Sequence, residues 1–290
     1  MLAGRVHVAQ QALRFAVQVD AARACRGEEA IHCACALAGD PGDVATVARP
    51  LLDAHLLTRL DHLHRLAAIP QHQHARGIDV DGGGRFRGIR RGAFWHESPA
   101  IQNHRTNPPE GLLLRDDFRA GFKHLAPRKL SFEVWCAHTQ IPDAISLARA
   151  FPDTTIVLDH FGGPVGIGPY KGKEEEVFAY WKGQIAELAR CQNVVAKLGG
   201  LNMEINGYDW HHRPSPPTSA ELAKATRRYF DYTIERFGPS RCMFESNFPV
   251  DKLSCSYTVL WNSFKLLSKG YSADERAALF HGTATRVYRL

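Results

Sequence analysis

The chain has 290 residues, of which 44% are hydrophobic and 23% charged, and it carries a formal net charge of +6. This composition is typical of a globular protein with room for one large domain or two ordinary ones. No apolar run approaches the ~20 residues that span a bilayer, and the N-terminus lacks the apolar core of a signal peptide, so we expect no membrane association. The basic residues are scattered without a nucleic-acid-binding motif, which argues against a nucleic-acid partner. The seven cysteines are too sparse for a disulfide framework and favour reduced thiols in a cytoplasmic protein.

The composition changes abruptly near residue 81. Residues 1–80 contain 17 Ala and seven of the 15 His, but no Lys, Ser, Asn, Tyr or Trp. All ten Lys, all five Trp and all eight Tyr lie after this point. We therefore divide the chain into an atypical Ala/Arg/His-rich segment, residues 1–80, and a conventional domain, residues 82–290.

Strand and helix patterns alternate from residue 85 onward. Short apolar runs predict five strands, at 85–90, 130–136, 154–158, 193–198 and 241–245. Amphipathic patterns and caps predict helices at 141–151 and 174–190, a helix capped by Thr218 and Glu221 that ends at Phe237, and a terminal helix at 273–289. The alternation predicts an α/β fold with a parallel sheet, and the absence of a dinucleotide or P-loop motif favours a barrel.

Polar side chains stand at or just beyond the end of every predicted strand. In barrels of this kind the chemistry lies at the carboxyl ends of the strands. The residues at these positions are Arg90, His138, Asp159 with His160, Lys197, and Asn247 with Asp251.

Four separated motifs resemble those of a known family. They are VLDHFGGP at 157–164, KLGG at 197–200, MFESNFPVD at 243–251 and GTATRVY at 282–288. In this order they resemble the amidohydrolase-related family, within it the lactonase and dicarboxylate-hydrolase-like branch, over about residues 82–290. The resemblance implies a (β/α)8 TIM barrel in which strands four to eight are recognisable and strands one to three are not. It also implies a hydrolase in which water attacks the carbonyl of a lactone or a similar cyclic ester or carboxylate.

The resemblance assigns roles to the residues at the strand ends. His138 and His160 match histidines that bind a divalent, zinc-like metal ion or the substrate, and such an ion would acidify a bound water. Arg90 is expected to pair with a carboxylate of the small-molecule substrate. Lys197 is expected to bind the substrate and to stabilise an oxyanion.

The motif after the last strand departs from the family pattern. The usual S-D-x-P sequence has Asn247 in place of the aspartate. An amide cannot accept a proton at neutral pH, so we expect Asn247 to position the attacking water together with Asp251. Asp251 or Glu245 is then the alternative base, and the expectation of a metal is weaker.

The family's first strand ends in H-x-H, which residues 1–80 do not supply at a workable spacing. His62-Leu63-His64 and His72-Gln73-His74 lie too close to the strand at residue 85 for two intervening βα units. Two interpretations of the segment stay open: an unrelated helical segment, or out-of-phase translation of GC-rich DNA. An incomplete barrel exposes two sheet edges, so we expect a homo-oligomer or poor solubility.

Residues 202–217 form a long polar and aromatic loop that we expect to cover the substrate. Metal binding by His211 and His212 is disfavoured, because adjacent side chains are expected to point apart. Two alternatives to a lactonase-like hydrolase remain: a catalytically impaired remnant of the barrel, and a decarboxylase of the same family.

Overall fold

The computed structural model describes residues 85–101 and 108–290, and these contain a five-stranded parallel sheet. The strands are hydrogen-bonded in chain order: β1 (Gly88–Gly92), β2 (Ser131–Trp135), β3 (Ile156–Leu158), β4 (Val194–Leu198) and β5 (Cys242–Phe244). Each lies within three residues of the limits predicted from the sequence. The sheet is that of a partial barrel, and the predictions for residues 1–80 lie outside the described residues.

The two faces of the sheet differ in chemistry because side chains alternate along each strand. One face is apolar and carries the core, with Phe132, Leu158 and Phe244 fully buried. The other face carries charged side chains: Arg90 of β1 lies opposite Glu133 of β2, and Lys197 of β4 follows two strands away. A charged interior face therefore runs across the middle of the sheet.

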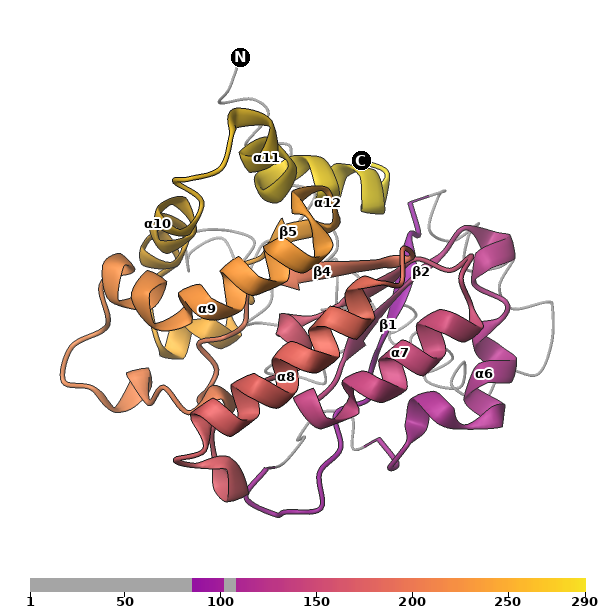
Figure 1. Cartoon of the computed structure of the whole chain (residues 1–290), viewed down its shortest axis with the longest axis horizontal. Coiled ribbons are helices and arrows are strands. Elements are labelled where there is room, and N and C mark those ends of the chain that lie inside the picture. The colour runs from indigo at the N-terminus through magenta and orange to yellow at the C-terminus, as the bar shows by residue number, and fades with distance from the viewer. Residues whose placement is uncertain (1–84, 102–107) are drawn as a thin grey trace, which may run out of the picture.

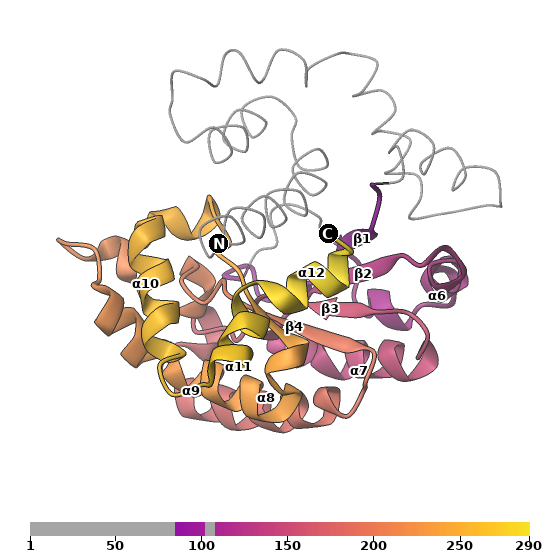
Figure 2. The same ribbon diagram turned by 90° about the horizontal axis from the view of Figure 1, so that it is seen from above.

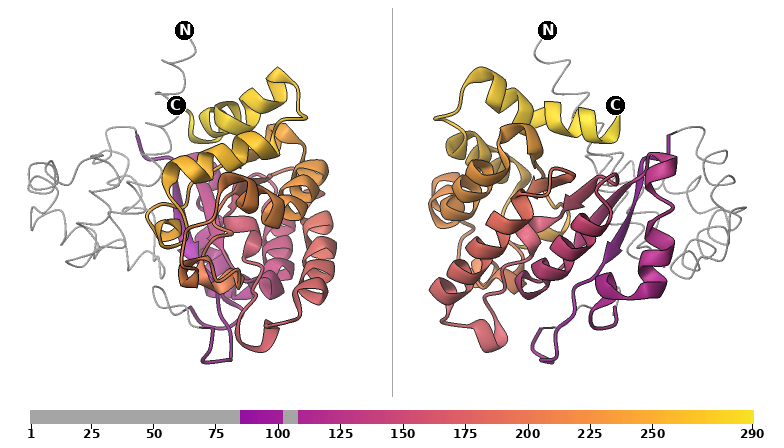
Figure 3. Two further views of the ribbon diagram at one scale, coloured as in Figure 1. Left: turned by 90° about the vertical axis from the view of Figure 1, so that its left-hand side faces the viewer. Right: turned by 45° about the vertical axis from the view of Figure 1, so that its right-hand side comes forward.

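Helices cover the apolar face. Helix α6 (Asp116–Phe122) precedes β2, and α7 (Ile141–Ala150), α8 (Glu174–Ala189) and α9 (Ser219–Phe237) lie side by side across the sheet (Figures 1 and 3). The predicted capping box is present, since the Thr218 hydroxyl accepts from the backbone N–H of Glu221. Trp181 of α8 is fully buried and donates from Nε1 to the Phe161 carbonyl, 2.7 Å away. This bond fastens the helix layer to the loop that follows β3.

The C-terminal region lies partly on the opposite side of the sheet. Helix α10 (Tyr257–Leu267) contacts α9, and the predicted helix at 273–289 is instead broken into α11 (Ala273–Ala277), a π-helical turn (Ala278–Gly282) and α12 (Thr283–Tyr288). Figure 2 shows α12 on the side of the strands away from α8. Ala284 and Tyr288 of α12 pack there with Val157, Val195 and Met243. No helix within the described ranges is long and apolar enough to cross a membrane.

Candidate active site

Arg90, Asp159 and His160 meet at the carboxyl edge of the sheet. Arg90 Nε lies 3.1 Å from Asp159 Oδ2, and Arg90 Nη2 lies 3.3 Å from His160 Nε2. Asp159 is fully buried, and burial raises its pKa to about 6. The positive charges of Arg90 and Lys197 lower the pKa, but by less than burial raises it. The two cations at 3.1 and 3.2 Å from its oxygens favour the ionised carboxylate. His160 and the following Phe161 both have positive φ values, 52° and 58°, which are uncommon outside glycine and concentrate at functional sites.

The other ring nitrogen of His160 faces Glu245. His160 Nδ1 lies 2.5 Å from Glu245 Oε1. Burial opposes a charge on the ring, but the Glu245 carboxylate raises the pKa of His160 above its ordinary value. Burial also opposes the charge on Glu245, whose pKa is nevertheless held at about 2 by His160 and Lys197. The pair is therefore arranged to stabilise a positive imidazole.

Lys197 lies beneath this pair in a buried charge network. Its ammonium lies 2.7 Å from Glu133 Oε2, 3.2 Å from Asp159 Oδ1 and 3.9 Å from Glu245 Oε2. Burial disfavours the charge, but the carboxylates raise the pKa of Lys197 well above its ordinary value. Tyr288 of α12 donates its hydroxyl to the second oxygen of Glu133. The network thus connects the last helix with the His160 loop.

Asn247 and Asp251 form a second polar pair beside this network. Asn247 Nδ2 donates to Asp251 Oδ1 at 2.6 Å, and Asn202 Nδ2 lies 3.3 Å from the other carboxylate oxygen. Asp251 is fully buried, and burial raises its pKa to about 7 although both amides and the nearby His160 favour the ionised form. Asn247 lies two residues after Glu245, the carboxylate that contacts His160, so the pair borders the same site. Asn247 has a φ of 52°, another positive value at this edge.

His138 lies apart from these contacts. Its ring packs edge-on against Tyr170 and Tyr180, with centroids 4.8 and 6.0 Å apart, and its Nδ1 accepts the Val165 N–H at 3.4 Å. Burial lowers the pKa of His138 to about 4, so the ring is neutral. The structure brings Arg90, His160 and Lys197 together but does not bring His138 into their network.

The contacts of His138 and His160 do not fit a shared divalent metal ion. Both nitrogens of His160 already face other groups, one of them the permanently charged Arg90. Within the described part of the chain, the metal-capable group found is Asp209, His211 and His212, on the loop after β4. A metal at His160 would have to displace Arg90 from Nε2 or enter between Nδ1 and Glu245.

Comparison with known proteins gives a family match and several relatives. A family model described as amidohydrolase matches residues 3–290. The chain is 38% identical over 205 residues to the uncharacterised protein y4mH of Sinorhizobium fredii, covering 71% of this chain and 61% of y4mH. It is 31% identical over 175 residues to L-fucono-1,5-lactonase of Burkholderia multivorans, covering 60% of this chain and 56% of the lactonase. The chain thus spans about three fifths of the length of these curated relatives.

Solved structures confirm the fold. An amidohydrolase of Burkholderia multivorans with HEPES bound superposes with a TM-score of 0.61 at 25% identity, covering 76% of this chain and 70% of that chain. The form with zinc bound superposes with a TM-score of 0.58 at 26% identity, covering 82% and 78%. The predicted TIM-barrel architecture is confirmed by these matches and by the parallel sheet.

Proposed function

Since this chain belongs to the amidohydrolase family, we propose that it hydrolyses a lactone or a similar cyclic ester, with His160 as the general base. The observation that carries the proposal is the position of His160 between Arg90 at Nε2 and Glu245 at Nδ1. The match to L-fucono-1,5-lactonase supports the substrate class.

We assign the proton of the neutral His160 ring from the contacts at its two nitrogens. Arg90 has no acceptor, so its bond to Nε2 requires that this nitrogen carry the lone pair. The ring proton is then on Nδ1, which lies 2.5 Å from the Glu245 carboxylate. A carboxylate in this position holds the imidazole and stabilises the cation that forms when Nε2 accepts a proton. Substrate that takes the hydrogen bonds of Arg90 leaves Nε2 free for a water molecule.

Arg90 is the cation that substrate can reach. Its side chain is 25% exposed, whereas that of Lys197 is 9% exposed and faces three carboxylates. We assign the carbonyl or carboxylate oxygen of the substrate to Arg90, while Lys197 acts through Asp159 and Glu133. Asn247, whose amide nitrogen is held by Asp251, offers its oxygen to the attacking water.

His160 carries one proton through both steps of the proposed reaction. The oxygen of water bonds to the carbonyl carbon as its proton passes to His160 Nε2. The ring C–O bond then breaks, and the departing alkoxide takes the same proton from His160. The product is a hydroxy acid, which ionises and releases one proton per turnover.

No step of this mechanism passes through a metal ion. A similar amidohydrolase has been solved with zinc bound. The contacts of His138 and His160 in this chain do not support zinc binding by these two residues. Zinc bound to such a family site would acidify water and polarise a carbonyl. In this chain His160 and Arg90 supply those two effects.

The experiment is a pH-stat assay of the purified full chain on a panel of sugar lactones and carboxylate-bearing lactones, with and without chelator. The proposal predicts acid release above the spontaneous rate for at least one lactone, without carbon dioxide release and with the same rate in chelator. No hydrolysis of any lactone would contradict the proposed activity. Loss of activity in chelator would contradict the mechanism without metal.

A further inference from the structure

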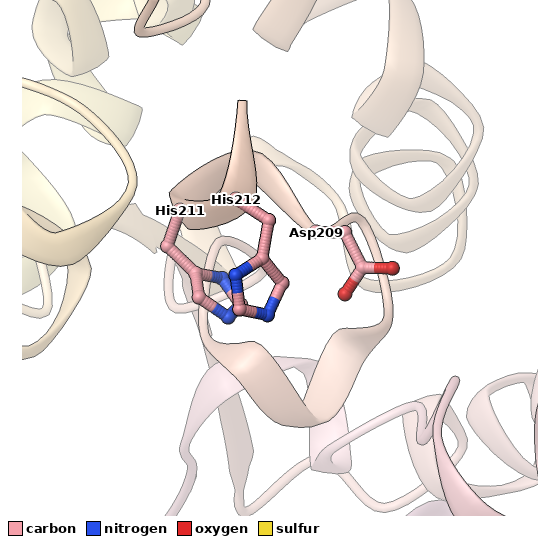
Figure 4. Close-up of side chains that lie close together, drawn as sticks. All are labelled: Asp209, His211 and His212. Atoms are coloured by element: carbon pink, nitrogen blue, oxygen red, sulfur yellow. The ribbon is translucent and has the colours of Figure 1, made fainter. Parts of the chain in front are cut away.

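Three side chains of metal-binding type gather on the loop between β4 and α9. The carboxylate of Asp209 and one nitrogen each of His211 and His212 lie within 4.8 Å of one another. Figure 4 shows the two imidazoles on one side of the turn, with Asp209 beside them. We propose that these residues form a binding site for a transition-metal ion such as zinc, separate from the catalytic site.

The geometry of the turn explains why adjacent histidines meet, contrary to the expectation from the sequence. Asp209 has a φ of 52°, and a 3-10 turn follows it over Trp210–His212. The His211 and His212 rings lie 4.0 Å apart between centroids, with 45° between their planes. Zinc takes His nitrogen and carboxylate oxygen at about 2.0–2.2 Å, so the donors need to close in around the ion. Asp209 and His212 are exposed and His211 is half-buried, which leaves the side chains room to do so.

The loop that carries the three residues is fastened just before the turn. Asn206 Nδ2 donates to the Pro164 carbonyl at 2.8 Å, and Tyr208 donates to the Ala225 carbonyl of α9 at 3.4 Å. The rings of Tyr208 and Trp210 stack at 5.7 Å with 13° between their planes. The backbone is therefore held before metal binds, which reduces the ordering cost of assembling the ligands.

The ligand set selects a class of metal ion. Two imidazoles and one carboxylate suit zinc, copper or nickel rather than magnesium or calcium. Three protein ligands leave a fourth tetrahedral position for water. The nearest cation along the chain, Arg213, is paired with Glu221 at 2.9 Å, which reduces its repulsion of a metal ion.

The test is calorimetric titration of zinc into the chelator-treated full chain and into its variants. H211A, H212A and D209N each remove one donor from an exposed or half-buried position, so circular dichroism is expected to be unchanged. H281A, a half-buried histidine of the π-helical turn, is the matched control. Residues 1–80 contain seven further histidines that could also bind zinc. The test therefore compares the zinc stoichiometry and affinity of each variant with those of the wild type.

We expect the H211A/H212A double variant to bind one zinc ion fewer than the wild type. Loss of a residue that only hydrogen-bonds to a metal ligand typically weakens metal binding 10–100-fold. Each single variant loses a ligand, so it is expected to bind this ion at least about 10-fold more weakly. H281A is expected to match the wild type. Equal stoichiometry and affinity in the wild type and the double variant would overturn the proposal, as would a wild type that binds no zinc. Neither result depends on lactone hydrolysis.

Discussion

Nδ1 of His160 contacts Oε1 of Glu245 at 2.5 Å although the two residues follow strands β3 and β5, which are separated by β4. The contact is possible because β4 is followed by Gly199 and Gly200. A Cβ on Gly200 would lie 2.4 Å from His160 Nδ1, and one on Gly199 would lie 2.1 Å from the Glu245 carbonyl oxygen. The KLGG motif therefore keeps the space between base and carboxylate free of side chains.

Replacing Glu245 by Gln is expected to lower kcat/KM and to shift its pH dependence. Burial lowers the pKa of His160 and the Glu245 charge raises it, so removing that charge lowers the pKa. The base is active when neutral, so the acid limb of the profile is expected at lower pH in E245Q. The measurement is kcat/KM against pH for both proteins and for E110Q, an exposed control. An unmoved acid limb in E245Q would show that this carboxylate does not act on the base.

Replacing Gly200 by Ala is expected to reduce both stability and activity. Gly200 has a φ of +76°, which costs a residue with Cβ about 1–2 kcal/mol, and the new methyl group would overlap His160. Urea unfolding and the lactone assay measure the two effects. Gly270 has ordinary backbone geometry and open space at its Cβ, so G270A is the control. Wild-type activity in G200A would mean that His160 needs no fixed position.

Replacing Lys197 by Met is expected to lower the free energy of unfolding by about 3–5 kcal/mol, the usual cost of leaving buried partners of an ion pair uncompensated. Glu133 and Asp159 would lose the ammonium that lies within 3.2 Å of both. Denaturant titration of K197M beside K224M, at an exposed position of α9, isolates the buried network. Equal losses in the two variants would indicate that the network adds no stability.

Replacing Asp251 by Asn is expected to change how stability depends on pH. Burial raises the pKa of this carboxyl from 3.8 to about 7, so between these values the folded chain binds more protons at this group than the unfolded chain. The protonated Asp251 carboxyl contributes on the order of 4 kcal/mol to the free energy of unfolding. This contribution is fully present below about pH 4 and is lost as pH rises to about 7. The wild type should therefore lose stability relative to D251N over this range, whereas the exposed D153N should follow the wild type. Parallel curves for wild type and D251N would contradict the assignment.

The strands and most helix ends were predictable because their signals are local. Buried apolar runs rich in β-branched residues, such as Ile156–Leu158, allow few alternatives to a strand. The N-cap Thr218 and the C-cap Gly238 define the ends of α9 within one residue. Helix α10 was missed although Ser256 caps it and its apolar residues Leu260, Phe264 and Leu267 are spaced for a helix. The π-helical break at 278–282, which packs against β5, has no such local signal.

The site was predictable only in part. The parallel strands bring Arg90, His160 and Lys197 together, although Arg90 lies in the middle of β1 and not at its end as predicted. His138 follows β2 as predicted, but its ring packs among tyrosines, which strand position alone does not reveal. Glu133 and Tyr288 were missed, although a single acidic residue inside the apolar run 130–136 was a usable signal. The roles assigned to the site residues remain predictions.

The most direct test is the rate of proton release by His160→Gln on the best lactone of the panel, beside the wild type and H281A. Glutamine keeps a polar side chain but cannot accept the proton from water, and general base catalysis contributes typically 10²–10⁴-fold. The account predicts a fall of at least about 100-fold in kcat for H160Q with the fold retained by circular dichroism, and none in H281A. A folded H160Q that hydrolyses the lactone at the wild-type rate would contradict it.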